Sequence, residues 1–262
     1  MKHFAVIGHP LDHSLSPRLF EAGFKALGLA AIYDKKDVNA SELEGLINDL
    51  RTGTYSGFSV TVPYKESVIP FLDTLTPQAQ MIGAVNTLYI RDGKVIGENT
   101  DWYGFKKVLN DCVDIRNKKI LIYGAGGVAR ACLYALQDIK NDVFITNRTQ
   151  AKAQILAKEF GVTYVSNTDL PHVDICINAT SIGLHSDTQL IVSPEWLKRV
   201  SVVFDLTYGE TLLTNTAKEL GIQTLDAKEM LLHQAVRQFE IFTDQVAPLI
   251  IMQKSLRNSL LT

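Results

Sequence analysis

The fold is decided by the stretch Tyr123-Gly124-Ala125-Gly126-Gly127-Val128-Ala129-Arg130. It follows the apolar run at 119–122, which is typical of a buried parallel strand, and precedes the run at 131–136, which is typical of a helix. Its small residues match the pattern G-x-G-x-x-A. A glycine-rich turn between a strand and a helix presents backbone N–H groups to a pyrophosphate. We therefore predict a dinucleotide-binding unit, with phosphate contacts from Gly124, Ala125, Gly126, Gly127, Val128 and Ala129.

Strands and helices alternate along the rest of the chain. The pair Asp92-Gly93 predicts a tight hairpin. Alternation of this kind is typical of parallel α/β sheets, and a length of 262 residues allows two domains that each bury a core. Further strands are predicted at 4–7, 58–62, 84–90, 143–146, 173–177 and 202–205.

We expect two α/β domains rather than one. The first comprises residues 1–101 and 228–262 and has a mainly parallel sheet. The second comprises residues 102–227 and has a Rossmann-type sheet. Two C-terminal helices, at about 228–243 and 246–261, are expected to return to the first domain, because the second already has enough strands for its sheet.

Composition excludes several classes of protein. A hydrophobic fraction of 46% and a charged fraction of 21% are typical of globular domains. The formal net charge of −2 gives no attraction for nucleic acid, and no apolar run approaches the roughly 20 residues that span a bilayer. The three cysteines are widely spaced and form neither a metal-ligand motif nor a disulfide framework. We expect a cytoplasmic protein that binds no metal, nucleic acid or membrane.

The strand after the glycine-rich turn indicates which dinucleotide is bound. An acidic residue about 20 positions past the first glycine would bond the ribose 2′-hydroxyl of NAD. Here the strand ends 23 residues past Gly124 (147 − 124) and delivers Asn147 and Arg148, with Lys152 soon after. A neutral residue and two cations suit a 2′-phosphate, which favours NADP. Alternatively, both cations are solvated charges at a helix start, although cations there oppose the helix dipole.

Polar residues after the strands of the first domain are candidates for proton transfer. Lys65 follows Val62-Pro63-Tyr64, at the strand end where open α/β sheets place ligands. Asp101 ends the segment Asn99-Thr100-Asp101. Asn86 interrupts an apolar run, so its buried amide needs a partner. The alternatives are a solvated surface lysine and an aspartate that only caps the following helix.

The N-terminal loop offers two further hydroxyl groups, from Ser14 and Ser16. The proline and polar residues of this loop exclude regular structure. Ser16 precedes Pro17, and such a pair is typical of a helix N-cap followed by the first helical residue. We therefore expect Ser16 to cap the helix that follows.

Together, these short motifs resemble the shikimate dehydrogenase family. The resemblance covers nearly the whole chain, and the motifs stand in the family's order. It rests on Ser14-Leu15-Ser16, Val60-Thr61-Val62-Pro63-Tyr64-Lys65, Gly83-Ala84-Val85-Asn86-Thr87, Asn99-Thr100-Asp101, Gly124-Ala125-Gly126-Gly127, Asn147-Arg148-Thr149, Asn178-Ala179-Thr180 and Met230-Leu231-Leu232-His233-Gln234-Ala235.

The resemblance implies reversible reduction of 3-dehydroshikimate to shikimate by NADPH. Lys65 and Asp101 would form the acid–base pair, because hydride arriving at a ketone carbon leaves charge on oxygen that an ammonium can stabilise or protonate. The resemblance implies that Ser14 and Ser16 hold the substrate carboxylate. It implies further substrate contacts at Thr61, Asn86, Asp101, Tyr208 and Gln234. It implies cofactor contacts at Asn147, Arg148, Thr149 and Lys152 besides the glycine-rich turn.

The chain departs from the family pattern at several positions, among them Ser59, Trp102, Ala227 and Glu229. These departures leave open a shikimate/quinate dehydrogenase-like paralogue that could use NAD. A dinucleotide-binding regulatory module with little activity is a further alternative, although such a module need not keep both Lys65 and Asp101. We expect a monomer or a homodimer.

Overall fold

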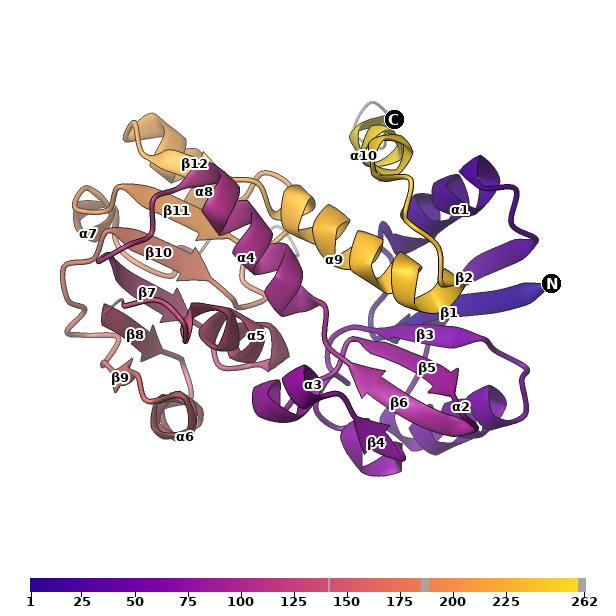
Figure 1. Cartoon of the computed structure of the whole chain (residues 1–262). Coiled ribbons are helices and arrows are strands. Elements are labelled where there is room, and N and C mark those ends of the chain that lie inside the picture. The colour runs from indigo at the N-terminus through magenta and orange to yellow at the C-terminus, as the bar shows by residue number, and fades with distance from the viewer. Residues whose placement is uncertain (141, 185–188, 259–262) are drawn as a thin grey trace. The chain divides into compact units, whose positions relative to one another are not determined.

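The computed structural model describes residues 1–140, 142–184 and 189–258. The chain forms two compact units, Met1–Gly104 with Leu231–Thr262 and Phe105–Met230 (Figure 1). Each unit contains one six-stranded sheet with helices packed on it. Among the described residues, no helix combines the length and the apolar character that crossing a membrane requires.

The sheet of the first unit has the strand order β2-β1-β3-β5-β6-β4. Three of its five pairings are parallel, and β5 pairs antiparallel with both β3 and β6. The sheet is therefore mixed, with the expected parallel majority. The β5–β6 hairpin turns at Asp92 and Gly93, whose φ angles of 52° and 72° suit a type I′ turn. The strands are β1 (Lys2–Gly8), β2 (Ala31–Asp37), β3 (Gly57–Val60), β4 (Thr74–Leu75), β5 (Thr87–Arg91) and β6 (Lys94–Glu98).

Aromatic side chains form the core on one face of this sheet. The Phe4 and Phe242 rings stack with centroids 4.9 Å apart, and those of Phe24 and Phe239 are 5.4 Å apart. Burial of each ring stabilises the fold by about 1.5–3 kcal/mol. Because Phe239 and Phe242 come from the C-terminal part of the chain, the final helices belong to this core, as expected. The helices on this face are α1 (Ser16–Ala26), α9 (Ala227–Thr243) and α10 (Leu249–Asn258).

The opposite face is covered by α2 (Leu43–Arg51) and α3 (Pro77–Ile82). Leu43, Ile47 and Leu50 recur at helical spacing along α2 and are at most 2% exposed. Two short 3₁₀ turns, η1 (Ala40–Glu42) and η2 (Ile69–Phe71), complete this layer.

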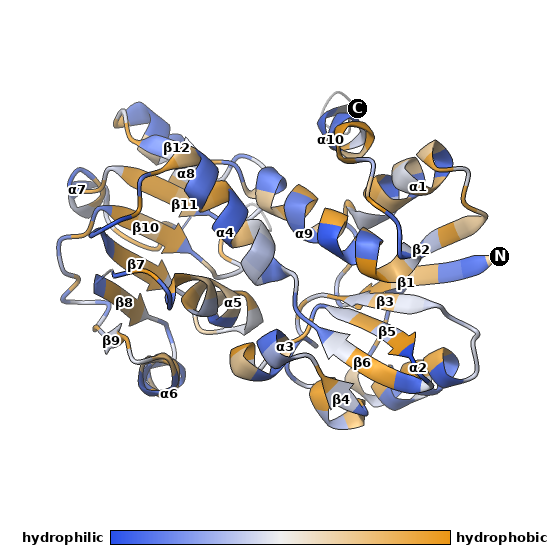
Figure 2. Ribbon diagram, viewed as in Figure 1, coloured by the Kyte–Doolittle hydropathy of each residue, from blue (hydrophilic) through white to orange (hydrophobic). Residues whose placement is uncertain are grey.

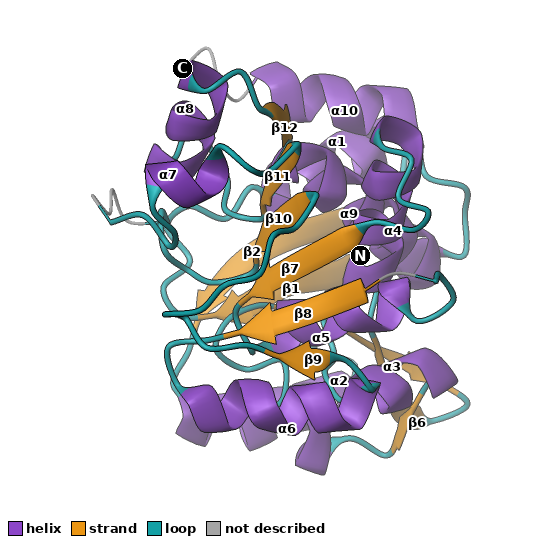
Figure 3. Ribbon diagram, turned by 90° about the vertical axis from the view of Figure 1, so that its left-hand side faces the viewer, coloured by secondary structure: helices purple, strands orange, loops and turns teal. Residues whose placement is uncertain are grey.

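The sheet of the second unit is entirely parallel, with the order β12-β11-β10-β7-β8-β9 (Figure 3). The chain starts at the central strand β7, moves outward through β8 to β9, and returns to β10 on the other side. This order is that of a Rossmann sheet, whose switch point lies beside β7. The strands are β7 (Lys119–Tyr123), β8 (Asp142–Thr146), β9 (Thr163–Tyr164), β10 (Ile175–Asn178), β11 (Val202–Asp205) and β12 (Gln223–Leu225).

Helices on both faces bury the central strands of the second sheet. Ile120, Leu121 and Ile122 are inaccessible to solvent, and Figure 2 shows the apolar character of β7, β10 and β11. A continuous apolar run is typical of a parallel strand covered on both faces. The helices are α4 (Asp101–Cys112), α5 (Gly127–Leu136), α6 (Gln150–Phe160), α7 (Pro194–Leu197) and α8 (Leu212–Glu219).

Some local predictions are wrong. Ser16 is not an N-cap: α1 starts at Ser16, so Leu15 takes the N-cap position and makes no side-chain cap bond. The strand expected at 84–90 begins only at Thr87, and the last helix begins at Leu249. The expected end of that helix at 259–261 lies outside the described residues.

Candidate functional site

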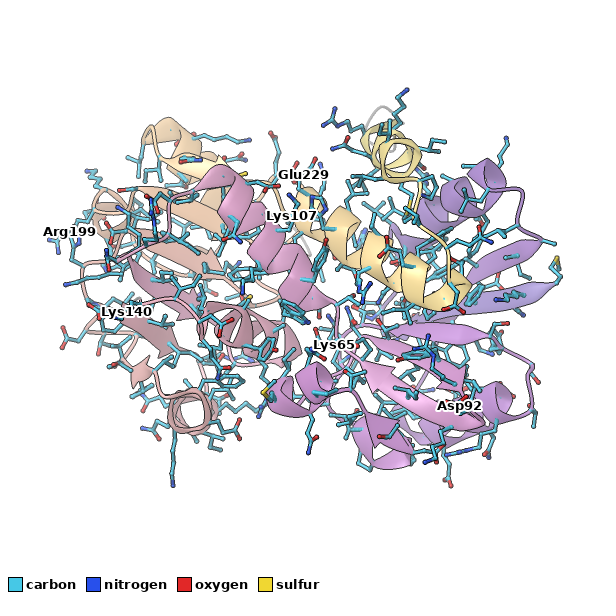
Figure 4. All side chains as sticks on the ribbon, in the orientation of Figure 1. Lys65, Asp92, Lys107, Lys140, Arg199 and Glu229 are labelled. Carbon is cyan, nitrogen blue, oxygen red and sulfur yellow. The ribbon has the colours of Figure 1, made fainter. Side chains whose placement is uncertain are left out.

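An ion pair between Lys65 and Asp101 lies in the first unit (Figure 4 labels Lys65). Lys65 Nζ donates to Asp101 Oδ2 over 2.7 Å, and the two side chains are only 11% and 7% exposed. Lys65 is held in the loop after β3, where its backbone oxygen accepts a hydrogen bond from Val85 N (2.8 Å). Asp101 opens α4, and its N–H donates to Asn99 Oδ1 (2.9 Å). Two charges largely removed from water persist only where further hydrogen bonds satisfy them.

Asn86 supplies the second hydrogen bond to this carboxylate. Asn86 Nδ2 donates to Asp101 Oδ1 (2.9 Å) and lies 3.0 Å from Thr100 Oγ1. Asn86 Oδ1 accepts from Thr100 N and from Thr87 Oγ1, each at 2.8 Å. Both oxygens of Asp101 are therefore engaged, one by an ammonium and one by an amide, which fixes the carboxylate.

Gln234 reaches the same cluster from α9. Its Nε2 donates to the Leu231 oxygen (2.9 Å), and its Oε1 lies 3.3 Å from Asn86 Nδ2. Thr100 Oγ1 lies 3.4 Å from the same oxygen. The structure thus brings together Lys65, Asn86, Asp101 and Gln234.

The remaining expected substrate residues of the first unit lie in the segments that follow β1 and β3. Thr61 directly follows β3, and its N–H donates to the Ile7 oxygen at the end of β1 (2.9 Å). Ser14 N donates to the Leu11 oxygen (3.0 Å) within the loop after β1. Ser16 is buried at the start of α1. Among the described residues, neither Lys65 nor Asp101 makes a direct hydrogen bond with Thr61, Ser14 or Ser16.

Thr100 and Thr87 were missed as members of the site by sequence reasoning. Both side chains are at most 1% exposed and hydrogen bond with Asn86. Their signal is present in the sequence, since Thr87 adjoins Asn86 and Thr100 adjoins Asp101, but a threonine beside an apolar run or before a helix ordinarily has a structural role.

The glycine-rich turn of the second unit leaves room for a phosphate. Gly124 has φ of +127° and donates its N–H to the Thr146 oxygen (2.8 Å). Gly126 is the N-cap of α5, whose first turn has no side-chain cap and no acidic residue. A Cβ added at Gly126 would meet no atom within 4 Å from the described residues beyond its two chain neighbours. The first turn of α5, which lacks a side-chain cap, and the open space at Gly126 suit the pyrophosphate of a dinucleotide.

We expect Gly124→Ala to lower the free energy of unfolding by on the order of 1–3 kcal/mol, because the φ angle is unfavourable for alanine. A Cβ there would also lie 2.6 Å from the Ala179 oxygen. The matched control is Gly126→Ala, at φ −106° in open space, which is expected to change stability by less than about 0.5 kcal/mol. Urea unfolding measures both variants, and equal stabilities would contradict this steric account.

The loop after β8 presents cations beside this turn. Asn147 Nδ2 donates to the Thr149 oxygen (3.0 Å), and Thr149 is the N-cap of α6 without a side-chain cap bond. Arg148 and Lys152 are exposed, and neither has an ion-pair partner in the described part of the chain. Two uncompensated cations at the start of a helix are available to an anionic group.

Tyr208 lies in the second unit, in a loop that Asp205 organises. Asp205 accepts hydrogen bonds from Thr211 Oγ1 (2.6 Å), Asn178 Nδ2 (2.9 Å) and Thr207 N (3.0 Å). Burial raises the pKa of Asp205, while these hydrogen bonds act against the rise. Tyr208 itself is 39% exposed. Within the described ranges, no cluster of three or more histidine, cysteine, aspartate or glutamate residues could hold a metal ion.

Three family sequence models match the chain. They describe a "Shikimate dehydrogenase substrate binding domain" at residues 6–88, "Shikimate / quinate 5-dehydrogenase" at 106–220 and a "Shikimate 5'-dehydrogenase C-terminal domain" at 229–257. Two curated relatives are called "Shikimate dehydrogenase (NADP(+))". That of Aquifex aeolicus is 38% identical over 97% of this chain and 96% of its own length. That of Methanocaldococcus jannaschii is 41% identical over 92% and 91%.

Solved structures show the same similarity in three dimensions. A shikimate dehydrogenase in complex with NADP⁺ superposes with a TM-score of 0.92 at 38% identity, over 99% of this chain and 96% of the other. The enzyme of Thermus thermophilus, in complex with NADP(H) and shikimate, gives 0.91 at 32% identity over 99% and 100%.

Proposed function

Because this chain belongs to the shikimate dehydrogenase family, we propose that it catalyses the reversible NADP-dependent interconversion of shikimate and 3-dehydroshikimate. The observation that carries this proposal is the buried Lys65–Asp101 pair, with its 2.7 Å bond and its link to Asn86. A regulatory module has no need of a lysine and a carboxylate that are shielded from water. An enzyme that transfers a proton to its substrate does need such a pair.

Lys65 is the proton donor for the reductive direction. Bound NADPH would supply a hydride to the ketone carbon of 3-dehydroshikimate. The π electrons of the carbonyl then become a lone pair on oxygen, and Lys65 Nζ gives that oxygen a proton. Asp101 holds the ammonium in place through Oδ2, and Asn86 fixes the carboxylate through Oδ1. In the oxidative direction, neutral Lys65 takes the hydroxyl proton back.

The polar groups around this pair supply substrate binding. The hydroxyl groups of shikimate are donors and acceptors, and amide side chains such as those of Asn86 and Gln234 can satisfy both roles. Thr61, directly after β3, and Asp101, at the start of α4, add further contacts. Ser14 and Ser16 hold the carboxylate, and the substrate contact expected at Tyr208 stays a prediction.

The second unit fits NADP. Gly124 to Ala129 hold the pyrophosphate at the N-terminus of α5, and Asn147 to Thr149 follow the neighbouring strand. Arg148 and Lys152 bind the 2′-phosphate by charge-assisted hydrogen bonds. Accordingly, the domains for substrate and cofactor comprise residues 1–101 with 228–262 and residues 102–227. A cytoplasmic location and a monomeric or homodimeric state stay predictions.

We expect Gly126→Ala to weaken NADP binding at least about 10-fold, because its methyl group occupies the space left for the phosphate. The fold is expected to be unchanged, since no described residue other than its two chain neighbours comes within 4 Å of that methyl. Calorimetric titration with NADP measures the effect, and wild-type affinity in the variant would place the phosphate elsewhere.

A two-by-two comparison tests the proposed reaction against the quinate and NAD alternatives. kcat/KM is measured for shikimate and for quinate, each with NADP and with NAD. We expect the shikimate–NADP combination to be fastest. A higher kcat/KM with quinate or with NAD would assign the chain to the paralogous group instead.

A further inference from the structure

A line of buried hydrogen bonds runs beside the acid–base pair. The Tyr33 hydroxyl donates to Ser59 Oγ (2.6 Å), and Ser59 Oγ donates to Gln238 Oε1 (2.8 Å). Gln238 Nε2 then donates to the backbone oxygen of Asn86 (2.8 Å) and to Thr87 Oγ1 (2.9 Å). All five residues are at most 5% exposed. They come from β2, β3, α9 and the start of β5, so the line joins elements that are distant in the sequence.

The donor and the acceptor of each hydrogen bond in this line can be assigned in only one way. The Asn86 backbone oxygen can only accept, so the Gln238 amide must turn Nε2 toward it and Oε1 toward Ser59. Ser59 has one proton, which goes to Gln238, and Ser59 must therefore accept from Tyr33. Thr87 accepts from Gln238, so its own proton goes to Asn86 Oδ1 (2.8 Å).

The direction of the line supports one orientation of the Asn86 amide. Asn86 Oδ1 receives the Thr87 hydroxyl proton and, independently, the Thr100 N–H (2.8 Å). Nδ2 is thereby turned toward Asp101 Oδ1 (2.9 Å). The reversed amide would place an oxygen against the carboxylate, where two acceptors repel each other.

We propose that Gln238, Ser59 and Tyr33 are positioning residues, which hold Asn86 so that its amide fixes Asp101 against Lys65. This inference rests on the proposed function for its catalytic consequence. The line contains no charged group, so it orients the ion pair without adding a further buried charge.

The other end of the line reaches the N-terminal serine loop. The Ser16 side chain lies near enough to the Tyr33 phenol to act against the rise in its pKa, while the phenol proton is committed to Ser59. Burial raises the pKa of Tyr33, so the phenol stays a neutral donor at physiological pH. The line of hydrogen bonds thus ends beside Ser16, a residue proposed to hold the substrate carboxylate.

The test uses Gln238→Met, which removes both bonds to the Asn86–Thr87 segment at similar side-chain length, and Tyr33→Phe, which removes one hydroxyl. We expect Gln238→Met to lower kcat at least about 10-fold, because two ordinary hydrogen bonds contribute enough free energy for an effect of that size. The KM for NADP is expected to stay unchanged. We expect Tyr33→Phe to lower kcat/KM for shikimate about 3-fold. The matched controls are Gln245→Met, at an exposed glutamine, and Tyr89→Phe, at a buried tyrosine outside the line. Both controls are expected to keep wild-type kinetics.

A second readout needs neither substrate nor cofactor. The side-chain ¹H–¹⁵N signals of Asn86 in labelled protein report whether its amide is held, and we expect them to shift in both variants but in neither control. Folded variants with wild-type kinetics and unshifted Asn86 signals would overturn the proposal, even if their unfolding midpoints fell. If Gln238→Met does not fold, Tyr33→Phe decides alone. If the wild-type protein does not oxidise shikimate, the proposed function fails while the Asn86 signals still decide the positioning role.

Discussion

Replacement of Lys65 by alanine is expected to lower kcat for shikimate oxidation by at least about 100-fold, the low end for loss of acid–base assistance. The Nζ atom is 2.7 Å from Asp101 Oδ2, and no other ammonium or guanidinium among the described residues pairs with that carboxylate. Initial rates with saturating NADP and shikimate measure the effect. The binding of NADPH should be retained, because the residues proposed to hold it are in the other unit.

The Lys65→Ala variant also leaves Asp101 buried without its charge partner, which costs about 3–5 kcal/mol of stability. The concentration of folded variant is therefore determined from the stoichiometry of NADPH binding. The value of kcat is then calculated for the folded molecules alone. Lys107→Ala is the matched control, because Lys107 pairs with Asp111 at 2.6 Å while both side chains are 42–49% exposed (Figure 4). That control is expected to keep wild-type kcat. Near-normal turnover in Lys65→Ala would remove Lys65 from the mechanism.

Replacement of Arg148 by alanine is expected to weaken NADPH about 10- to 100-fold, the effect of losing a charged hydrogen bond worth about 1.5–3 kcal/mol. NADH lacks the 2′-phosphate, so its weaker binding should change by less than about 3-fold. Calorimetric titration of both nucleotides gives the two ratios. Arg116→Ala, at an exposed arginine of the same unit paired with Asp114, is the control. Equal losses for NADPH and NADH would show that Arg148 does not contact the 2′-phosphate.

The sequence predicted those parts of the fold that depend on local pattern. The alternation of apolar runs and helices indicated the Rossmann sheet, and the Asp92-Gly93 pair indicated the β5–β6 hairpin. The antiparallel pairing of β5 with β3 has no such local signal. Two-residue strands such as β4 are also too short to produce a periodicity.

The candidate site was predicted where short motifs carry it, as at Lys65, Asn86 and Asp101. The line of buried hydrogen bonds through Tyr33, Ser59 and Gln238 was not predicted, because the residues that it joins are far apart in the sequence. Ser59 and Gln238 are separated by 179 positions, and each alone resembles an ordinary polar residue within an apolar element. The prediction that Ser16 caps α1 was wrong because the helix already includes Ser16, which leaves Leu15 at the N-cap position.

The most direct test of the central claim, that a buried lysine–aspartate pair serves NADP-dependent oxidation of shikimate, is one absorbance measurement. Purified protein is mixed with NADP and shikimate, and the near-ultraviolet band of reduced nicotinamide is followed. We predict a rise in that band that depends on shikimate and is nearly abolished in Lys65→Ala. No rise with the wild-type protein, under conditions where calorimetry shows that both NADP and shikimate bind, would contradict the account.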